Sequence, residues 1–109
     1  FTRDPAYGLT LTVGSGGVTA ELLKDTVTLL PPINVVEAKE AILSLRLSPL
    51  LTGYRGRPKA DVDAAAVALV ALSVYAETHA AALDELDINP LIITAGGAYA
   101  ADALIRIRG

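Results

Sequence analysis

The chain contains the stretch Glu85-Leu86-Asp87-Ile88-Asn89-Pro90, in which polar and apolar side chains alternate strictly. This alternation predicts a β-strand, because successive side chains of a strand point to opposite faces of the sheet. The oxygen-bearing side chains share one face, and Leu86 and Ile88 share the other. One face is therefore expected to pack into the core, while the other remains polar.

The residues that follow predict a β-hairpin. Residues 91–94 continue the apolar run, residues 95–97 (Ala-Gly-Gly) are a turn signal, and residues 99–107 form a second strand-like run. A two-residue turn over the first two turn residues places Asn89 directly opposite Asp102, and one over the last two offsets them by two residues on the same face. A three-residue turn separates them, so their proximity depends on the turn.

An amide and a carboxylate brought together in this way predict a magnesium site. Asn89 and Asp102, with Asp87 or Glu85 as a supporting carboxylate, are hard oxygen ligands that suit Mg²⁺ shared with substrate phosphates. The alternative is an amphipathic strand whose outer face is merely solvated. Pro90 favours the metal interpretation slightly, because proline inside a strand usually marks an edge or a bulge.

Composition limits the classes of protein that this chain can represent. It has 109 residues and a formal net charge of -3, with 52% hydrophobic but only 5% aromatic residues. This is room for one small domain, and the scattered Lys and Arg residues argue against a nucleic-acid groove or an anionic membrane surface. The chain has no cysteine, which excludes disulfides, and no apolar run is long enough to span a bilayer. Because it begins at Phe1 without Met and shows no signal peptide, we expect a cytoplasmic piece of a larger protein.

A glycine-rich segment follows the first predicted strand. Residues 8–13 alternate as a half-buried strand, and Gly14-Ser15-Gly16-Gly17 comes directly after them. These glycines permit positive φ and close backbone approach, so a phosphate or acyl group could lie against exposed N–H groups. The segment matches neither the dinucleotide fingerprint nor the P-loop. From composition alone, a tight hairpin loop or bulge is the favoured explanation.

The middle of the chain predicts a second hairpin and a helix. Residues 18–23 and 26–30 read as strands joined at Lys24-Asp25, and Asn34 with Glu37 forms a capping box that starts a helix to about residue 45. The apolar positions that recur at helical spacing, and so predict the buried face of this helix, are Val35, Ala38, Ile42 and Leu45.

A loop and a second helix precede the final hairpin. Residues 50–58 form a glycine- and proline-marked loop with Arg55 and Arg57, which could hold a phosphate or carboxylate or could be a solvated connector. Asp61 can cap an alanine-rich helix that runs to about His79 and packs closely against a sheet. The single histidine is expected to be a surface residue at the helix end rather than a catalytic group.

Taken together, these segments resemble the ATP-grasp domain of nucleoside-diphosphate-forming acyl-CoA synthetases. That family includes ADP-forming acetyl-CoA synthetase and is related to the β subunit of succinyl-CoA synthetase. The segments that carry the resemblance are residues 2–8, 14–18, 21–25, 53–58, 85–91 and 98–107, in that order. The resemblance covers essentially the whole chain.

The resemblance implies roles for individual residues. Asn89 and Asp102 match the residues that hold the metal of Mg-ATP in such domains, and Asp87 matches an acidic position in the succinyl-CoA synthetase version, which ranks it above Glu85. The glycine loop faces the active site in the family, a role that falls on Gly14, Gly16 and Gly17. The resemblance leaves the tasks of Glu21, Arg55 and Arg57 open.

The predicted fold is α+β: an antiparallel sheet of about five strands with two helices on one face, as in the C-terminal ATP-grasp subdomain. Residues 1–109 are expected to form this single domain within a larger synthetase. The resemblance implies Mg²⁺ and ATP or ADP as cofactors, and CoA and a carboxylic acid as substrates of the full enzyme. Neither nucleic acid nor membrane is expected as a partner.

The family transfers a phosphoryl group between ATP and a histidine, and then to an acyl group captured by CoA. The lysines that hold the phosphates, the adenine site, the CoA site and the phosphohistidine belong to other segments, so this polypeptide alone is expected to be inactive. One alternative is a non-catalytic module that senses nucleotide or acyl-CoA and is fused to another enzyme such as an acyltransferase. Another is a structural domain that has lost the site.

Overall fold

The computed structural model describes residues 1–14, 25–46, 48–53, 59–88 and 90–108. Its elements, in chain order, are β1 (Thr2–Asp4), β2 (Gly8–Gly14), β3 (Thr26–Leu29), α2 (Val35–Ser44), α3 (Ser48–Leu51), α4 (Val62–Thr78), β4 (Leu83–Ile88), β5 (Leu91–Thr94), β6 (Gly97–Ala100) and β7 (Ala103–Ile107).

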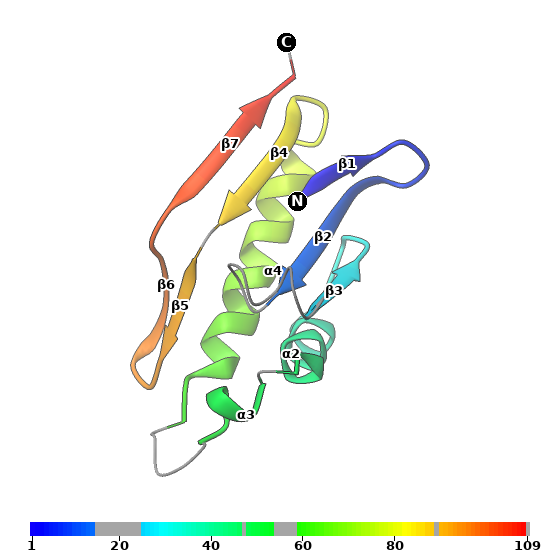
Figure 1. Cartoon of the computed structure of the whole chain (residues 1–109). Coiled ribbons are helices and arrows are strands. Elements are labelled where there is room, and N and C mark those ends of the chain that lie inside the picture. Colours follow the sequence, from blue (N-terminus) through cyan, green and yellow to red (C-terminus); the bar gives the residue numbers. More distant parts are fainter. Residues whose placement is uncertain (15–24, 47, 54–58, 89, 109) are drawn as a thin grey trace.

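Five of the strands form one antiparallel sheet in the order β3-β2-β1-β4-β7, and β5 pairs with β6 in a separate two-stranded sheet. Helices α4 and α2 lie on the same side of the strands (Figure 1). No described helix covers the opposite side of the sheet. The predicted α+β fold, with about five antiparallel strands and two main helices on one face, is therefore confirmed.

Helix α2 begins where the sequence predicts. The side chain of Asn34 accepts a hydrogen bond from the Glu37 backbone N–H at 2.8 Å, and the Glu37 carboxylate accepts one from the Asn34 N–H at 3.2 Å. This reciprocal pair satisfies two N–H groups that the helix itself leaves unbonded. Of the predicted buried face, Ala38, Ile42 and Leu45 are buried, but Val35 is 41% exposed. Val35 lies in the first turn of the helix, before the helix reaches the core.

Helix α4 is held at both ends. Asp61 is its N-cap and accepts the Ala64 N–H at 2.9 Å, while the Asp61 N–H donates to the carbonyl of Thr94 at 2.7 Å. His79 is the C-cap, and its side chain is exposed, as predicted. Ala65 is completely buried, and such small residues allow α2 and α4 to approach closely.

Two clusters of buried side chains form the core between the sheet and the helices. The larger comprises Leu11, Ile33, Ala38, Ile42, Val62, Ala65, Ala66 and Leu69. The smaller comprises Ala76, Leu83 and Leu86. Phe1 packs against both clusters and so joins them. The core is aliphatic and alanine-rich, as the low aromatic content requires.

Three predictions about local structure need correction. The strand predicted over residues 99–107 is split into β6 and β7. A short helix, α3, stands at the start of the region predicted as a loop. Strand β1 was not predicted. Of the predicted second hairpin, residues 18–23 lie outside the described residues, and β3 pairs with β2 through residues 11–14.

Arg3 ties β1 to the connection between α4 and β4. Its guanidinium donates to the carbonyl of Ala80 and, at 2.5 Å, to the carbonyl of Leu83. The Ala80 carbonyl lies beyond the end of α4 and the Leu83 carbonyl lies at the start of β4, and a charged donor bonds such carbonyls more strongly than a neutral one. The central strand is thereby fixed to the end of the longest helix.

We predict that Arg3→Met lowers the free energy of unfolding by about 1.5–3 kcal/mol, because two partly buried carbonyls lose a charged donor. Urea unfolding followed by circular dichroism measures this change. Arg108→Met, at an exposed arginine, is the control and is expected to change the free energy by less than about 0.5 kcal/mol. Equal effects of the two substitutions would contradict this role of Arg3.

Candidate functional site

The final hairpin has the register of a two-residue turn. Thr94 pairs with Gly97, which leaves Ala95 and Gly96 as the turn. Gly97 has φ of 144°, and a side chain there would meet the hydroxyl of Tyr99 at 3.4 Å. Glycine is therefore required at this position.

The same register continues through both halves of the hairpin. In the half nearer the turn, Leu91 pairs with Ala100, and in the main sheet Ile88 pairs with Ala103. Between these pairs, the Ala101 N–H donates to the carbonyl of Pro90 at 3.0 Å. The pairing thus follows one of the two turn alternatives that keep positions 89 and 102 on one face, although Asn89 itself lies outside the described residues.

The hairpin changes its inward face where the candidate ligands occur. In β4, Leu86 is buried in the core. In the paired strands β5 and β6, Ile93 and Ala98 pack against the core. The core-facing positions are therefore even-numbered at the end of β4 and odd-numbered in β5. Irregularities of this kind re-aim side chains and are common beside active sites. Pro90, Ala101 and Asp102 lie between the two ladders, at the point of change.

The predicted acidic ligands are accessible. Asp102 is exposed, and its Oδ1 accepts a hydrogen bond from the backbone N–H of Ala103 at 2.9 Å. Asp87 is also exposed, on β4 opposite Leu104. Glu85 differs, because its Oε2 lies 3.4 Å from Nη1 of Arg106 on β7. Of the two candidate ligands on β4, Asp87 is thus the one without an ion pair among the described residues.

The sheet brings Gly14 to the same end as these candidate ligands. Thr2 pairs with Thr10 on one side and with Glu85 on the other, so β2 and β4 run parallel on either side of β1. Gly14 lies four residues beyond Thr10, and Ile88 lies three residues beyond Glu85. Because strands rise equally per residue, Gly14 and Ile88 end at nearly the same level of the sheet.

Gly14 is the only glycine of the predicted phosphate loop that the structure describes. It is the last residue of β2 and pairs with Thr26. Gly16 and Gly17 lie outside the described residues, as do Glu21, Arg55 and Arg57. The sequence did not predict β1, the short strand that lies between β2 and β4, because three residues are too few to show periodicity.

Two of the acidic side chains of β4, Glu85 and Asp87, act electrostatically on the amino group of Phe1. The amino group of Phe1 donates to the carbonyl of Leu86 at 2.6 Å. Burial lowers the pKa of this amino group, while the carboxylates of Asp87 and Glu85 act in the opposite direction. Attraction by these carboxylates thus partly offsets the lowering of the pKa by burial.

The described residues contain no group of three or more His, Cys, Asp or Glu side chains that could hold a metal ion. A cage built from the described part of the chain is therefore excluded. The exposed oxygens of Asp87 and Asp102 suit a hard cation that keeps waters and takes other ligands from a phosphate. This donor set fits Mg²⁺ bound together with a nucleotide.

A family model described as "ATP-grasp domain" matches residues 1–107. The chain is 39% identical over 107 residues to trans-feruloyl-CoA synthase FCS1 from an unknown prokaryotic organism, an alignment covering 96% of this chain and 15% of that protein. It is 32% identical over 110 residues to the β subunit of ADP-forming acetate–CoA ligase II from Pyrococcus furiosus, covering 99% of this chain and 47% of that subunit. The chain thus spans less than half of these relatives.

Solved structures agree with this likeness. The dinucleotide-forming acetyl-coenzyme A synthetase 1 of Ca. Korarchaeum cryptofilum, in complex with coenzyme A and Mg-AMPPCP, matches with a TM-score of 0.89 and 33% identity. The match covers 98% of this chain and 50% of that one. The same synthetase with a phosphorylated phosphohistidine segment matches with a TM-score of 0.88 at 33% identity, over 98% of this chain and 47% of that one.

We predict that Asp102→Ala changes the free energy of unfolding by less than about 0.5 kcal/mol, because among the described residues the exposed carboxylate bonds only to the adjacent N–H. By contrast, Leu86→Ala is expected to cost about 2–4 kcal/mol through the cavity it leaves. Urea unfolding of both variants measures the difference. A loss above 1 kcal/mol for Asp102→Ala would mean that the fold, rather than a ligand, requires this side chain.

Proposed function

Because the chain belongs to the ATP-grasp domain family, we propose that it is the Mg-ATP-binding part of an ADP-forming acyl-CoA synthetase. The observation that carries this proposal is the convergence of Gly14 and Asp102 at one end of the sheet. Glycine backbone and hard oxygen ligands at the same end of a sheet are two features that suit a metal-bound triphosphate. We place residues 1–109 as the C-terminal subdomain of a longer synthetase.

In this proposal Asn89 and Asp102 are the metal ligands, and Asp87 is the supporting carboxylate. The exposure of both aspartates supports the assignment, and the pairing of Glu85 with Arg106 favours Asp87 over Glu85. Magnesium supplies charge neutralisation on the β- and γ-phosphates when it is bound. The protein's own contribution is to hold these oxygens at the kink of the hairpin, where no described side chain covers Asp102.

The phosphates themselves fall to Gly14, Gly16 and Gly17. Backbone N–H groups without a side chain beside them can approach an anion closely, and they add no competing charge. The position of Gly14 at the end of β2 supports this assignment, since the ladder with β3 ends there at the pair with Thr26.

The remaining steps require other parts of the synthetase. A Korarchaeum neighbour is described with its phosphohistidine segment pointing towards the nucleotide-binding site. We propose that this chain serves an equivalent phosphohistidine, with CoA and a carboxylic acid bound elsewhere, in a cytoplasmic enzyme. No described helix is long and apolar enough to cross a membrane.

We predict that the 109-residue chain by itself forms no acyl-CoA from ATP, CoA and acetate, because the phosphohistidine and the CoA site are not within it. Loss of free CoA thiol and release of ADP are the measurements. A longer protein that carries the chain together with a phosphohistidine segment is expected to be active in the same assay. Turnover by the isolated chain would overturn this division of labour.

Metal binding is testable on the chain itself with Mn²⁺ in place of Mg²⁺. In the presence of AMPPCP, we expect Mn²⁺ to broaden the amide signals of Asp87, Asp102 and Ala103 more than those of other residues. We expect Asp102→Ala to abolish this preferential broadening. Asp63→Ala, at an exposed acid on α4, is the control and should leave the broadening unchanged. Broadening centred on other surface carboxylates would refute the assigned site.

A further inference from the structure

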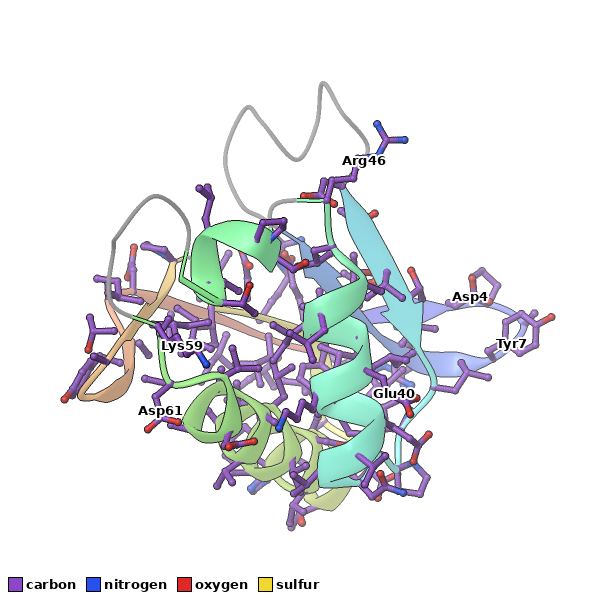
Figure 2. All side chains as sticks on the ribbon, turned by 90° about the horizontal axis from the view of Figure 1, so that it is seen from below. Asp4, Tyr7, Glu40, Arg46, Lys59 and Asp61 are labelled. Carbon is purple, nitrogen blue, oxygen red and sulfur yellow. The ribbon has the colours of Figure 1, made fainter. Side chains whose placement is uncertain are left out.

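Asp25 is a buried carboxylate with a specific backbone partner. Only 3% of the residue is exposed, and its Oδ1 accepts a hydrogen bond from the backbone N–H of Arg46 at 2.6 Å. The side chain of Arg46 points away from the fold (Figure 2). The bond therefore depends on the position of the main chain at residue 46, and the arginine side chain is not needed for it.

This bond joins the end of a rigid helix to the β2–β3 ladder. Arg46 follows Leu45, the C-cap of α2, and α2 is fixed in the core by Ala38 and Ile42. On the other side, Asp25 directly precedes Thr26, which pairs with Gly14. Any displacement of Asp25 is therefore passed to Gly14 through a single strand pair.

Packing alone does not explain an aspartate at this position. Burying a carboxylate costs free energy that an apolar residue of similar size would not, and hydrogen bonds only offset that cost. A carboxylate does provide a short, directional bond to a backbone N–H, which fixes the distance between two elements. This fits a residue that sets a position more closely than one that fills space.

We propose that Asp25 is a positioning residue for the nucleotide site: it holds Gly14 at the height of the candidate metal ligands by anchoring β3 to the end of α2. The inference rests on the proposed function, because it assigns Gly14 a phosphate to face. Asp25 itself does not touch the nucleotide. Its effect is exerted through the Thr26–Gly14 pair.

The bond can be removed from either side. Asp25→Ala removes the acceptor, and Asp25→Asn keeps a weaker, neutral one. Arg46→Pro removes the donor N–H and leaves the carboxylate in place. The proline is compatible with the chain before it, because Leu45 has φ of -65° and ψ of 144°, the extended conformation favoured before proline. If Asp25→Ala does not fold, Arg46→Pro still tests the bond.

The experiment uses a full-length synthetase that carries this chain and measures the Kd of Mg-AMPPCP and of CoA by calorimetry. We expect Asp25→Ala and Arg46→Pro each to raise the Kd of Mg-AMPPCP about fivefold, a change within the range that residues remote from a ligand exert on its binding. Asp25→Asn should raise it less, and the Kd of CoA should not change. The double variant should be no weaker than Asp25→Ala alone, since Asp25→Ala already removes the acceptor of the Arg46 N–H.

Asp63→Asn, which alters an exposed ion pair with Lys39, is the matched control and should leave both constants unchanged. The inference is overturned if the variants melt at a lower temperature but bind Mg-AMPPCP as tightly as the parent, or if nucleotide and CoA affinities fall together. Asp102→Ala in the same protein separates the two proposals. If that variant keeps full affinity for Mg-AMPPCP, the proposed metal site fails, whatever Asp25 does.

Discussion

The pairing of β1 with both of its neighbours is the constraint on which the rest of the structure depends. A three-residue strand stands between β2 and β4, and Thr2 has a partner on each. Arg3 fixes the same strand to the carbonyls that follow α4, and Phe1 fills the core between the two buried clusters. Without β1, the β2–β3 ladder and the β4–β7 ladder would have no common edge, and the helices would have no single sheet to cover.

The sheet then separates packing from chemistry. Leu11, Leu83 and Leu86 point toward the helices and are buried, while Thr12 and Asp87 lie exposed on the other strand faces. A polar face costs nothing in stability while it remains solvated, so its residues are free to be selected for a ligand. Functional change at this face is therefore compatible with an unchanged core.

The candidate site forms where regular pairing stops. Gly14 ends β2, and Asp102 lies between two strand ladders whose inward faces differ. A regular strand has all of its backbone groups paired along the ladder, whereas an interruption exposes backbone and re-aims side chains. The Asp25 carboxylate plays the complementary part, because it restores a fixed connection beside one of these interruptions.

Local sequence alone determined the capping box of Asn34, the Asp61 cap, the amphipathic character of β4 and the presence of a turn within residues 95–97, though not which two residues form it. Each depends on residues at most a few positions apart, so periodicity and turn chemistry suffice to find it. The candidate ligands and the glycine segment also came from sequence, largely through family resemblance. Only the tertiary structure decided that β1 lies between β2 and β4, that β3 pairs with β2, and that the hairpin changes its inward face near Asp102. These features depend on contacts between segments far apart in the chain, and their free energy is absent from any local pattern.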